Sequence, residues 1–219
     1  MTVVRKCRGV SLFILSAIAA LTLEACGGSA TSGAGGSPDG GASAASPPDA
    51  FVEATMGPGA GPGGSCALTS PQSVLSIGST GAGRPMTVAD GQSQNGHTAQ
   101  VSCSVAAAGS GFDVKLHAAI DGGGGFDVSS PAGAGAVTET GGQGISVTWQ
   151  DPVLGTARED DCSLAFTYAG DAVPASPAVA PGRIWAHVSC PNAAVSPSSG
   201  TMAGTCDGEA DFLFENCTQ

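Results

Sequence analysis

Short stretches of this 219-residue chain alternate between apolar and polar residues with a period of two. In residues 112–120 (FDVKLHAAI), Phe112 and Leu116 would share one side of an extended strand, and Lys115 and His117 the other. The same alternation occurs in residues 145–149, 162–168, 184–190 and 210–214. Glycine-rich turns separate these stretches, and no stretch keeps a helical apolar spacing for three turns. The pattern predicts an all-β sandwich or barrel of about seven to nine antiparallel strands.

The first 25 residues have the pattern of a secretory signal peptide. Arg5, Lys6 and Arg8 precede a mostly apolar run of about fifteen residues, 9–23. A helix that crosses a bilayer usually needs about 20 apolar residues, so this run is short for a membrane span. A basic start with a short apolar run is instead typical of a segment that directs secretion and is then removed.

Cys26 directly follows this segment. Leu23, Ala25 and Cys26 resemble the lipobox of bacterial lipoproteins, although Glu24 occupies a position that is normally small or apolar. The resemblance implies cleavage before Cys26, a diacylglyceryl group on its thiol and an acylated new N-terminus. Two or three acyl chains make a stable anchor. The family's sorting rule, applied to Gly27, implies the outer membrane. The alternative is an ordinary secreted protein in which Cys26 keeps a free thiol.

A broader resemblance covers residues 1–217. The segments VSCSV, GRIWAHVSCP and FLFENC are similar to those of small secreted lipoproteins of myxobacteria. This resemblance implies a location and a fold, and it implies no known activity.

The composition changes near Cys66. Glycine, alanine, serine and proline dominate residues 26–65, which predicts a disordered linker after the lipidated cysteine. Bulky residues in this linker gather in the island 49–56 (DAFVEATM), for which a docking motif and a chance cluster both stay open. Residues 66–219 have the length of a single domain and are expected to form the β-sandwich.

The chain is strongly acidic. Its net charge is −11, and removal of residues 1–25 would leave four basic and seventeen acidic residues, or −13. A surface of this charge repels nucleic acid, so we exclude a nucleic-acid partner.

Six of the eight cysteines lie in the expected domain. An even number of cysteines in an oxidising compartment predicts three disulfides, and the absence of C-x-x-C argues against a zinc or redox site. A hairpin of strands 183–190 and 206–216 would bring two cysteines together, and a bridge between early and late strands would close the sandwich. The favoured pairs are therefore Cys190–Cys206, Cys103–Cys217 and Cys66–Cys162. A competing register that places Cys162 opposite Cys190 stays open.

The alternation also selects a candidate binding surface. Trp185 and His187 fall on the polar side of their strand, where an exposed tryptophan could stack on a sugar ring or a partner. The alternative is a second sheet that covers Trp185. His117 and His187 would bind a metal only if they met across a sheet, and solvent-facing positions explain them without one. The acidic clusters 159–161 and 207–211 lack EF-hand spacing, so we expect no metal and no cofactor.

Known catalytic motifs are absent from the sequence. It contains no G-x-S-x-G, H-E-x-x-H or P-loop pattern, and no catalytic residue is predicted. We therefore expect a non-enzymatic, outer-membrane-tethered lipoprotein with a structural, adhesive or accessory role. The membrane would be its partner through Cys26, and an envelope protein or a carbohydrate a further partner. The alternative function is a ligand-binding module, for example for carbohydrate, on the Trp185–His187 surface.

Overall fold

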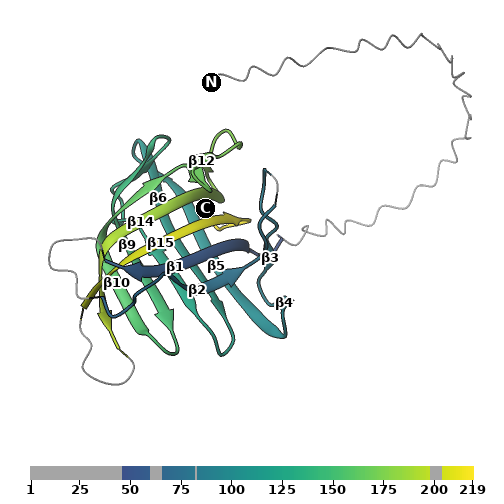
Figure 1. Cartoon of the computed structure of the whole chain (residues 1–219). Coiled ribbons are helices and arrows are strands. Elements are labelled where there is room, and N and C mark those ends of the chain that lie inside the picture. Colours follow the sequence, from purple (N-terminus) through teal and green to yellow (C-terminus); the bar gives the residue numbers. More distant parts are fainter. Residues whose placement is uncertain (1–45, 60–65, 82, 198–203) are drawn as a thin grey trace, which may run out of the picture. The chain divides into compact units, whose positions relative to one another are not determined.

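The computed structural model describes residues 46–59, 66–81, 83–197 and 204–219 (Figure 1). Contacts divide the chain into two units, Met1–Ala42 and Ser43–Gln219. The predicted signal peptide and Cys26 lie outside the described residues. No helix in the described ranges is long and apolar enough to cross a membrane.

The described residues form fifteen strands. They are β1 (Asp49–Pro58), β2 (Gln72–Ile77), β3 (Val88–Ala89), β4 (Ser93–Gln94), β5 (His97–Ala108), β6 (Gly111–Ile120), β7 (Gly125–Ser129), β8 (Val137–Thr138), β9 (Gly141–Asp151), β10 (Gly155–Ala165), β11 (Thr167–Tyr168), β12 (Asp171–Ala172), β13 (Val179–Ala180), β14 (Arg183–Ser196) and β15 (Gly204–Glu215). Each stretch of alternation found in the sequence lies in one or two of these strands.

Thirteen strands belong to one sheet. Its main path runs β2-β1-β15-β14-β10-β9-β7-β6-β5-β4, while β13, β3 and β8 pair beside it and β11 and β12 form a separate ribbon. All pairings between these strands are antiparallel. The predicted all-β, antiparallel fold with disulfides is confirmed.

A single core lies on the inner face of this sheet. In Figure 1, strands β14, β15, β1 and β2 lie in front of β9, β6 and β5, so the sheet folds back over itself. The fully buried Trp149, Phe126 and Phe212 lie in the core cluster. Gly208 makes room for the indole, because a Cβ at this position would lie 2.6 Å from the ring of Trp149. The small residue and the large one are therefore matched across the core.

The outer edge of β5 is hydrogen-bonded to distant parts of the chain. Val105 donates its backbone N–H to the carbonyl of Thr218 at 2.9 Å, and Thr218 donates to the carbonyl of Cys103 at 3.0 Å. Gly182 donates to the carbonyl of Val105 at 2.9 Å. These bonds occupy backbone groups that would otherwise form an exposed edge open to pairing with another chain.

The predicted linker boundary at residue 65 is wrong. Asp49–Pro58 forms β1, which lies between β2 and β15 and pairs with β15 over its whole length. Phe51 and Val52 are fully buried. Consecutive buried residues give no alternation, because β1 has an apolar neighbour on both faces at this point. The island of bulky residues is therefore a central strand of the domain.

The three disulfides differ in part from the expected scheme. Cys103 is bonded to Cys217, as expected, with Cα atoms 4.8 Å apart. The other two expected pairs, Cys190–Cys206 and Cys66–Cys162, are not formed. The structure has Cys66–Cys206 and Cys162–Cys190, with Cα separations of 4.8 and 4.6 Å.

The register of β14 explains this correction. Strands β14 and β15 do pair, but a bulge between Cys190 and Ala193 places Cys190 opposite Gly208 and Ala193 opposite Cys206. On its other side β14 pairs with β10, where Leu164 faces Val188. Two residues further along, this register brings Cys162 next to Cys190, which is the competing register left open by the sequence.

Candidate functional site

The predicted Trp185–His187 surface is only partly available. Trp185 points away from the main core, yet it is just 2% exposed. Together with Phe51 and Leu213 it forms a second apolar cluster, against which Tyr168 of β11 packs. The Tyr168 ring lies 5.5 Å from the ring of Trp185 and 5.8 Å from that of Phe51. The expectation of an exposed Trp185 is therefore wrong, because the β11–β12 ribbon covers it.

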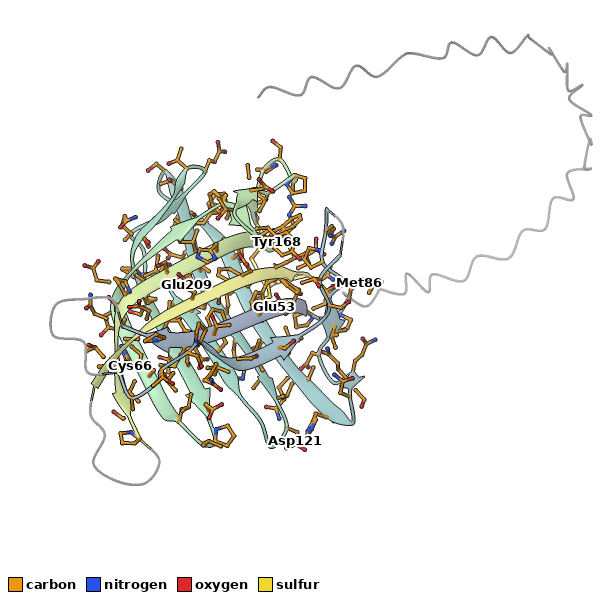
Figure 2. The ribbon with its side chains drawn as sticks, viewed as in Figure 1. Glu53, Cys66, Met86, Asp121, Tyr168 and Glu209 are labelled. Carbon is orange, nitrogen blue, oxygen red and sulfur yellow. A yellow bond between two sulfur atoms is a disulfide. The ribbon has the colours of Figure 1, made fainter. Side chains whose placement is uncertain are left out.

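His187 lies beside this cluster on the outward face of β14. Its Nδ1 is 3.0 Å from Oδ1 of Asp211, and its cross-strand row continues from Asp211 to Glu53 of β1. Figure 2 shows Glu53, Tyr168 and Glu209 on this side of the molecule. The hydrogen bond to Asp211 raises the pKa of His187 above its usual value, and burial partly opposes the shift. Burial also raises the pKa of Tyr168, with a contribution from the charge of Glu53.

The raised pKa of His187 predicts a pH-dependent contribution to folding stability. This contribution is fully present below the unfolded-state pKa of about 6.5 and is lost as the pH rises through the folded-state pKa. Since the His187 side chain is 29% exposed, we expect a loss of up to about 1 kcal/mol, or about 2–4 °C in Tm. His187→Gln should flatten this part of the Tm profile. The exposed His97 offers a control, and a flattened profile in His97→Gln would contradict the assignment.

A second surface has the form of a groove. The outward side chains of β5, β6 and β7 form two cross-strand rows, Ser102–His117–Asp127 and Ser104–Lys115–Ser129. They line an open hollow of about 590 Å³, which Pro48, Asn216 and Thr218 border from other parts of the chain. We call this hollow the β5–β6–β7 groove. Its strands β5 and β6 lie behind β14, β15 and β1 in Figure 1.

Hydrogen bonds fix one side of the groove. Nδ1 of His117 lies 2.7 Å from Oδ1 of Asp127, and Gln150 donates to Oδ2 of Asp127 at 3.2 Å. Because an ionised carboxylate only accepts, Nδ1 of His117 carries the proton and Nε2 is left for another group. Asp113, four residues before His117 on the same side of β6, accepts hydrogen bonds from the backbone N–H groups of Gly133 and Gly135.

The groove does not assemble a hydrolytic triad. Ser102 on β5 lies opposite His117, but Asp127, which contacts the imidazole, lies on β7, the neighbour of β6 on the other side. Within the described ranges no side-chain hydrogen bond joins Ser102 to His117. The backbone N–H groups of paired strands are also occupied, so they offer no oxyanion hole. The arrangement suits hydrogen bonding to a ligand better than nucleophilic attack.

One group of metal-ligand residues occurs in the described part of the chain: Glu159, Cys162 and Cys190. The two cysteines form a disulfide, so neither offers a thiolate to a metal ion.

A smaller apolar hollow of about 270 Å³ lies beside the Cys66–Cys206 disulfide. Met56, Leu68 and Leu154 contribute to its lining, which offers no charged side chain. Cys66, Pro197 and Gly204, which also line it, stand at the ends of described ranges. The polar groove is therefore the better candidate site.

Comparisons with known proteins do not identify a family for this chain. No protein family, curated protein or solved structure matches it. The function of the groove therefore has to be argued from its own side chains.

Sequence reasoning missed most of this groove. His117 and Lys115 were placed on the polar side of their strand, but their neighbours Ser102, Ser104 and Ser129 carried no signal. Serine is common in β-rich surface segments, so only the cross-strand alignment shows that these hydroxyls converge.

Proposed function

We propose that this protein is an outer-membrane-tethered lipoprotein whose extracytoplasmic β domain is a non-enzymatic ligand-binding module. The β5–β6–β7 groove is its binding site. The observation that carries the proposal is the convergence of three serine hydroxyls, Lys115 and His117 on one open hollow. Hydroxyls both donate and accept hydrogen bonds, so such a lining suits a hydroxyl-rich ligand such as an oligosaccharide.

The binding site differs from the surface expected from the sequence. Carbohydrate binding through Trp185 required an exposed indole, and this indole is covered by Tyr168. The groove supports the same class of ligand by hydrogen bonding in place of stacking. A purely structural or adhesive role is the competing hypothesis, and it predicts that the groove binds no small ligand.

The architecture of the domain is, in this proposal, a β-sandwich made from one folded sheet. Strands β2, β1, β15 and β14 form one half, and β10, β9, β7, β6 and β5 the other. The buried faces of both halves contribute to one core cluster, as the two packed halves of a sandwich would.

Lipid on Cys26 would hold the domain close to the membrane. Because β1 begins at Asp49, the tether would comprise the 22 residues from Gly27 to Pro48. A Gly- and Ser-rich chain of this length has a root-mean-square reach of about 26 Å. Since Pro48 borders the groove, the tether would join the domain at the rim of its binding site.

The lipid anchor predicts the behaviour of a Cys26→Ser variant. Without the thiol, we expect no incorporation of a fatty-acid probe and release of the protein from the membrane fraction. Cys7→Ser is the matched control, because Cys7 lies in the predicted signal peptide and should leave labelling unchanged. Undiminished labelling of Cys26→Ser would contradict the anchor.

Filling the groove should abolish ligand binding. We would titrate the mature chain carrying Cys26→Ser with short neutral and uronate oligosaccharides and follow backbone amide shifts by NMR. We expect shifts confined to β5, β6 and β7, and at least about tenfold weaker binding in Ser104→Phe. Ser163→Phe, on the outward face of β10, is the matched control. Absence of shifts with every oligosaccharide would favour the structural role.

A further inference from the structure

We infer that the β5–β6–β7 groove selects an anionic ligand: a carboxylate carried on a hydroxyl-rich molecule, as in a uronic-acid sugar. Lys115 is the residue that binds the carboxylate. This inference rests on the proposed function of the groove and adds the charge of the ligand to it.

Lys115 differs from the other basic residues of the domain. The described arginines all have partners: Arg84 pairs with Glu215, Arg158 with Asp160, and Arg183 with the carbonyl of Pro177. In the described ranges, the ammonium group of Lys115 has neither an ion pair nor a hydrogen bond. It is also the sole lysine beyond the predicted signal peptide. An exposed cation without a partner is unusual in a chain with so many acids.

The nearest acids on this face are already engaged. Asp127 accepts from His117 and Gln150, one hydrogen bond on each carboxylate oxygen. Asp113 lies two residues before Lys115 on the same side of β6, and its oxygens accept from the backbone N–H groups of Gly133 at 2.6 Å and Gly135 at 3.3 Å. Neither carboxylate is in contact with the Lys115 ammonium, which leaves that charge available to a ligand.

Two serines flank Lys115 across the sheet. Ser104 and Ser129 are the two cross-strand neighbours of Lys115, and within the described residues neither hydroxyl has a hydrogen-bond partner. A carboxylate between them would accept one charge-assisted bond and two hydroxyl bonds. Nε2 of His117, two residues along β6, would then accept from a ligand hydroxyl.

The groups that line the groove favour a carboxylate over a phosphate group. A phosphate carries up to two charges and is usually bound by arginine forks or several backbone N–H groups. The groove offers one lysine, and its backbone N–H groups are used in the sheet. A ligand with a single negative charge and neighbouring hydroxyl groups matches one lysine flanked by serines. The groove also has no exposed aromatic ring, so stacking would contribute little to binding a neutral sugar.

A matched pair of ligands tests this selectivity. We would titrate trigalacturonate and its fully methyl-esterified form into the mature chain carrying Cys26→Ser, with inorganic phosphate as a third arm. We expect the acid to bind about tenfold more tightly than the ester, and Lys115→Gln to remove that difference. Arg158→Gln, which removes an exposed arginine of β10, should keep it. Raising the salt concentration should weaken binding of the acid selectively.

The outcomes separate this inference from the proposed function. If acid and ester bind equally and Lys115→Gln changes neither, the groove is a ligand site but the selectivity for a carboxylate is wrong. If phosphate displaces trigalacturonate and binds more tightly, the ligand class is overturned in favour of phosphate. If neither sugar binds, both the inference and the proposed function are wrong.

Discussion

A chain that lacks residues 46–58 is expected not to fold. These residues include β1, which lies in the sheet between β2 and β15 and buries Phe51, Val52 and Ala54 completely. Each large apolar side chain contributes about 1.5–3 kcal/mol through burial, and the loss also unpairs both neighbouring strands. The sum is comparable with the roughly 5–15 kcal/mol that stabilises a typical domain.

Circular dichroism and thermal melting would measure this effect. The matched control is a deletion of residues 27–45, which removes a longer segment rich in glycine, alanine and serine and leaves β1 in place. The control should melt cooperatively, while the chain that lacks residues 46–58 should show no transition. Limited proteolysis of the unaltered chain should likewise yield a resistant fragment that starts near residue 46. A cooperative transition in the chain that lacks residues 46–58 would show that β1 is dispensable.

Replacing Cys103 and Cys217 by alanine should cause the second large loss of stability. The disulfide spans 114 residues, for which loop-closure entropy predicts about 5 kcal/mol. It also holds Thr218 in position, where its backbone caps the edge of β5. The Cys162–Cys190 disulfide spans 28 residues, and its removal should cost between about 3 and 4 kcal/mol.

Urea denaturation of the two double variants would compare these losses. A loss for Cys162→Ala/Cys190→Ala that exceeds the loss for Cys103→Ala/Cys217→Ala would contradict a closing role for the longer bridge. Peptide mapping without reduction gives an independent check. It should recover the three pairs of the structure, and a Cys190–Cys206 peptide would refute the register of β14 and β15.

The alternation of apolar and polar residues in the sequence predicted the strands that have one buried face. Residues 112–120, 184–190 and 210–214 alternate because every second side chain enters the core, and each of them lies in a strand. The link between Cys103 and Cys217 could also be expected, since it joins early and late strands of a closed sheet. These features depend on local periodicity and on simple topology, which the sequence contains.

Other features were decided by the tertiary structure. Alternation fixes which face a residue lies on but leaves the pairing register open, so the bulge after Cys190 changed two disulfides. Phe51 and Trp185 point outward and are buried all the same, because the β11–β12 ribbon covers that face. No local pattern reports such a cover, and for this reason the sequence predicts a linker where the structure has β1.

The side chains that line the β5–β6–β7 groove were likewise brought together only by the tertiary structure. Ser104, Lys115 and Ser129 are each an ordinary polar residue on an outward face. They form a row only because β5, β6 and β7 pair in one particular register. A shift of one residue in either pairing would turn these side chains to the opposite face. The sequence by itself determined that this chain forms antiparallel strands with one buried face. The long-range register, which depends on contacts between residues far apart in the chain, determined which side chains are aligned on the outer face.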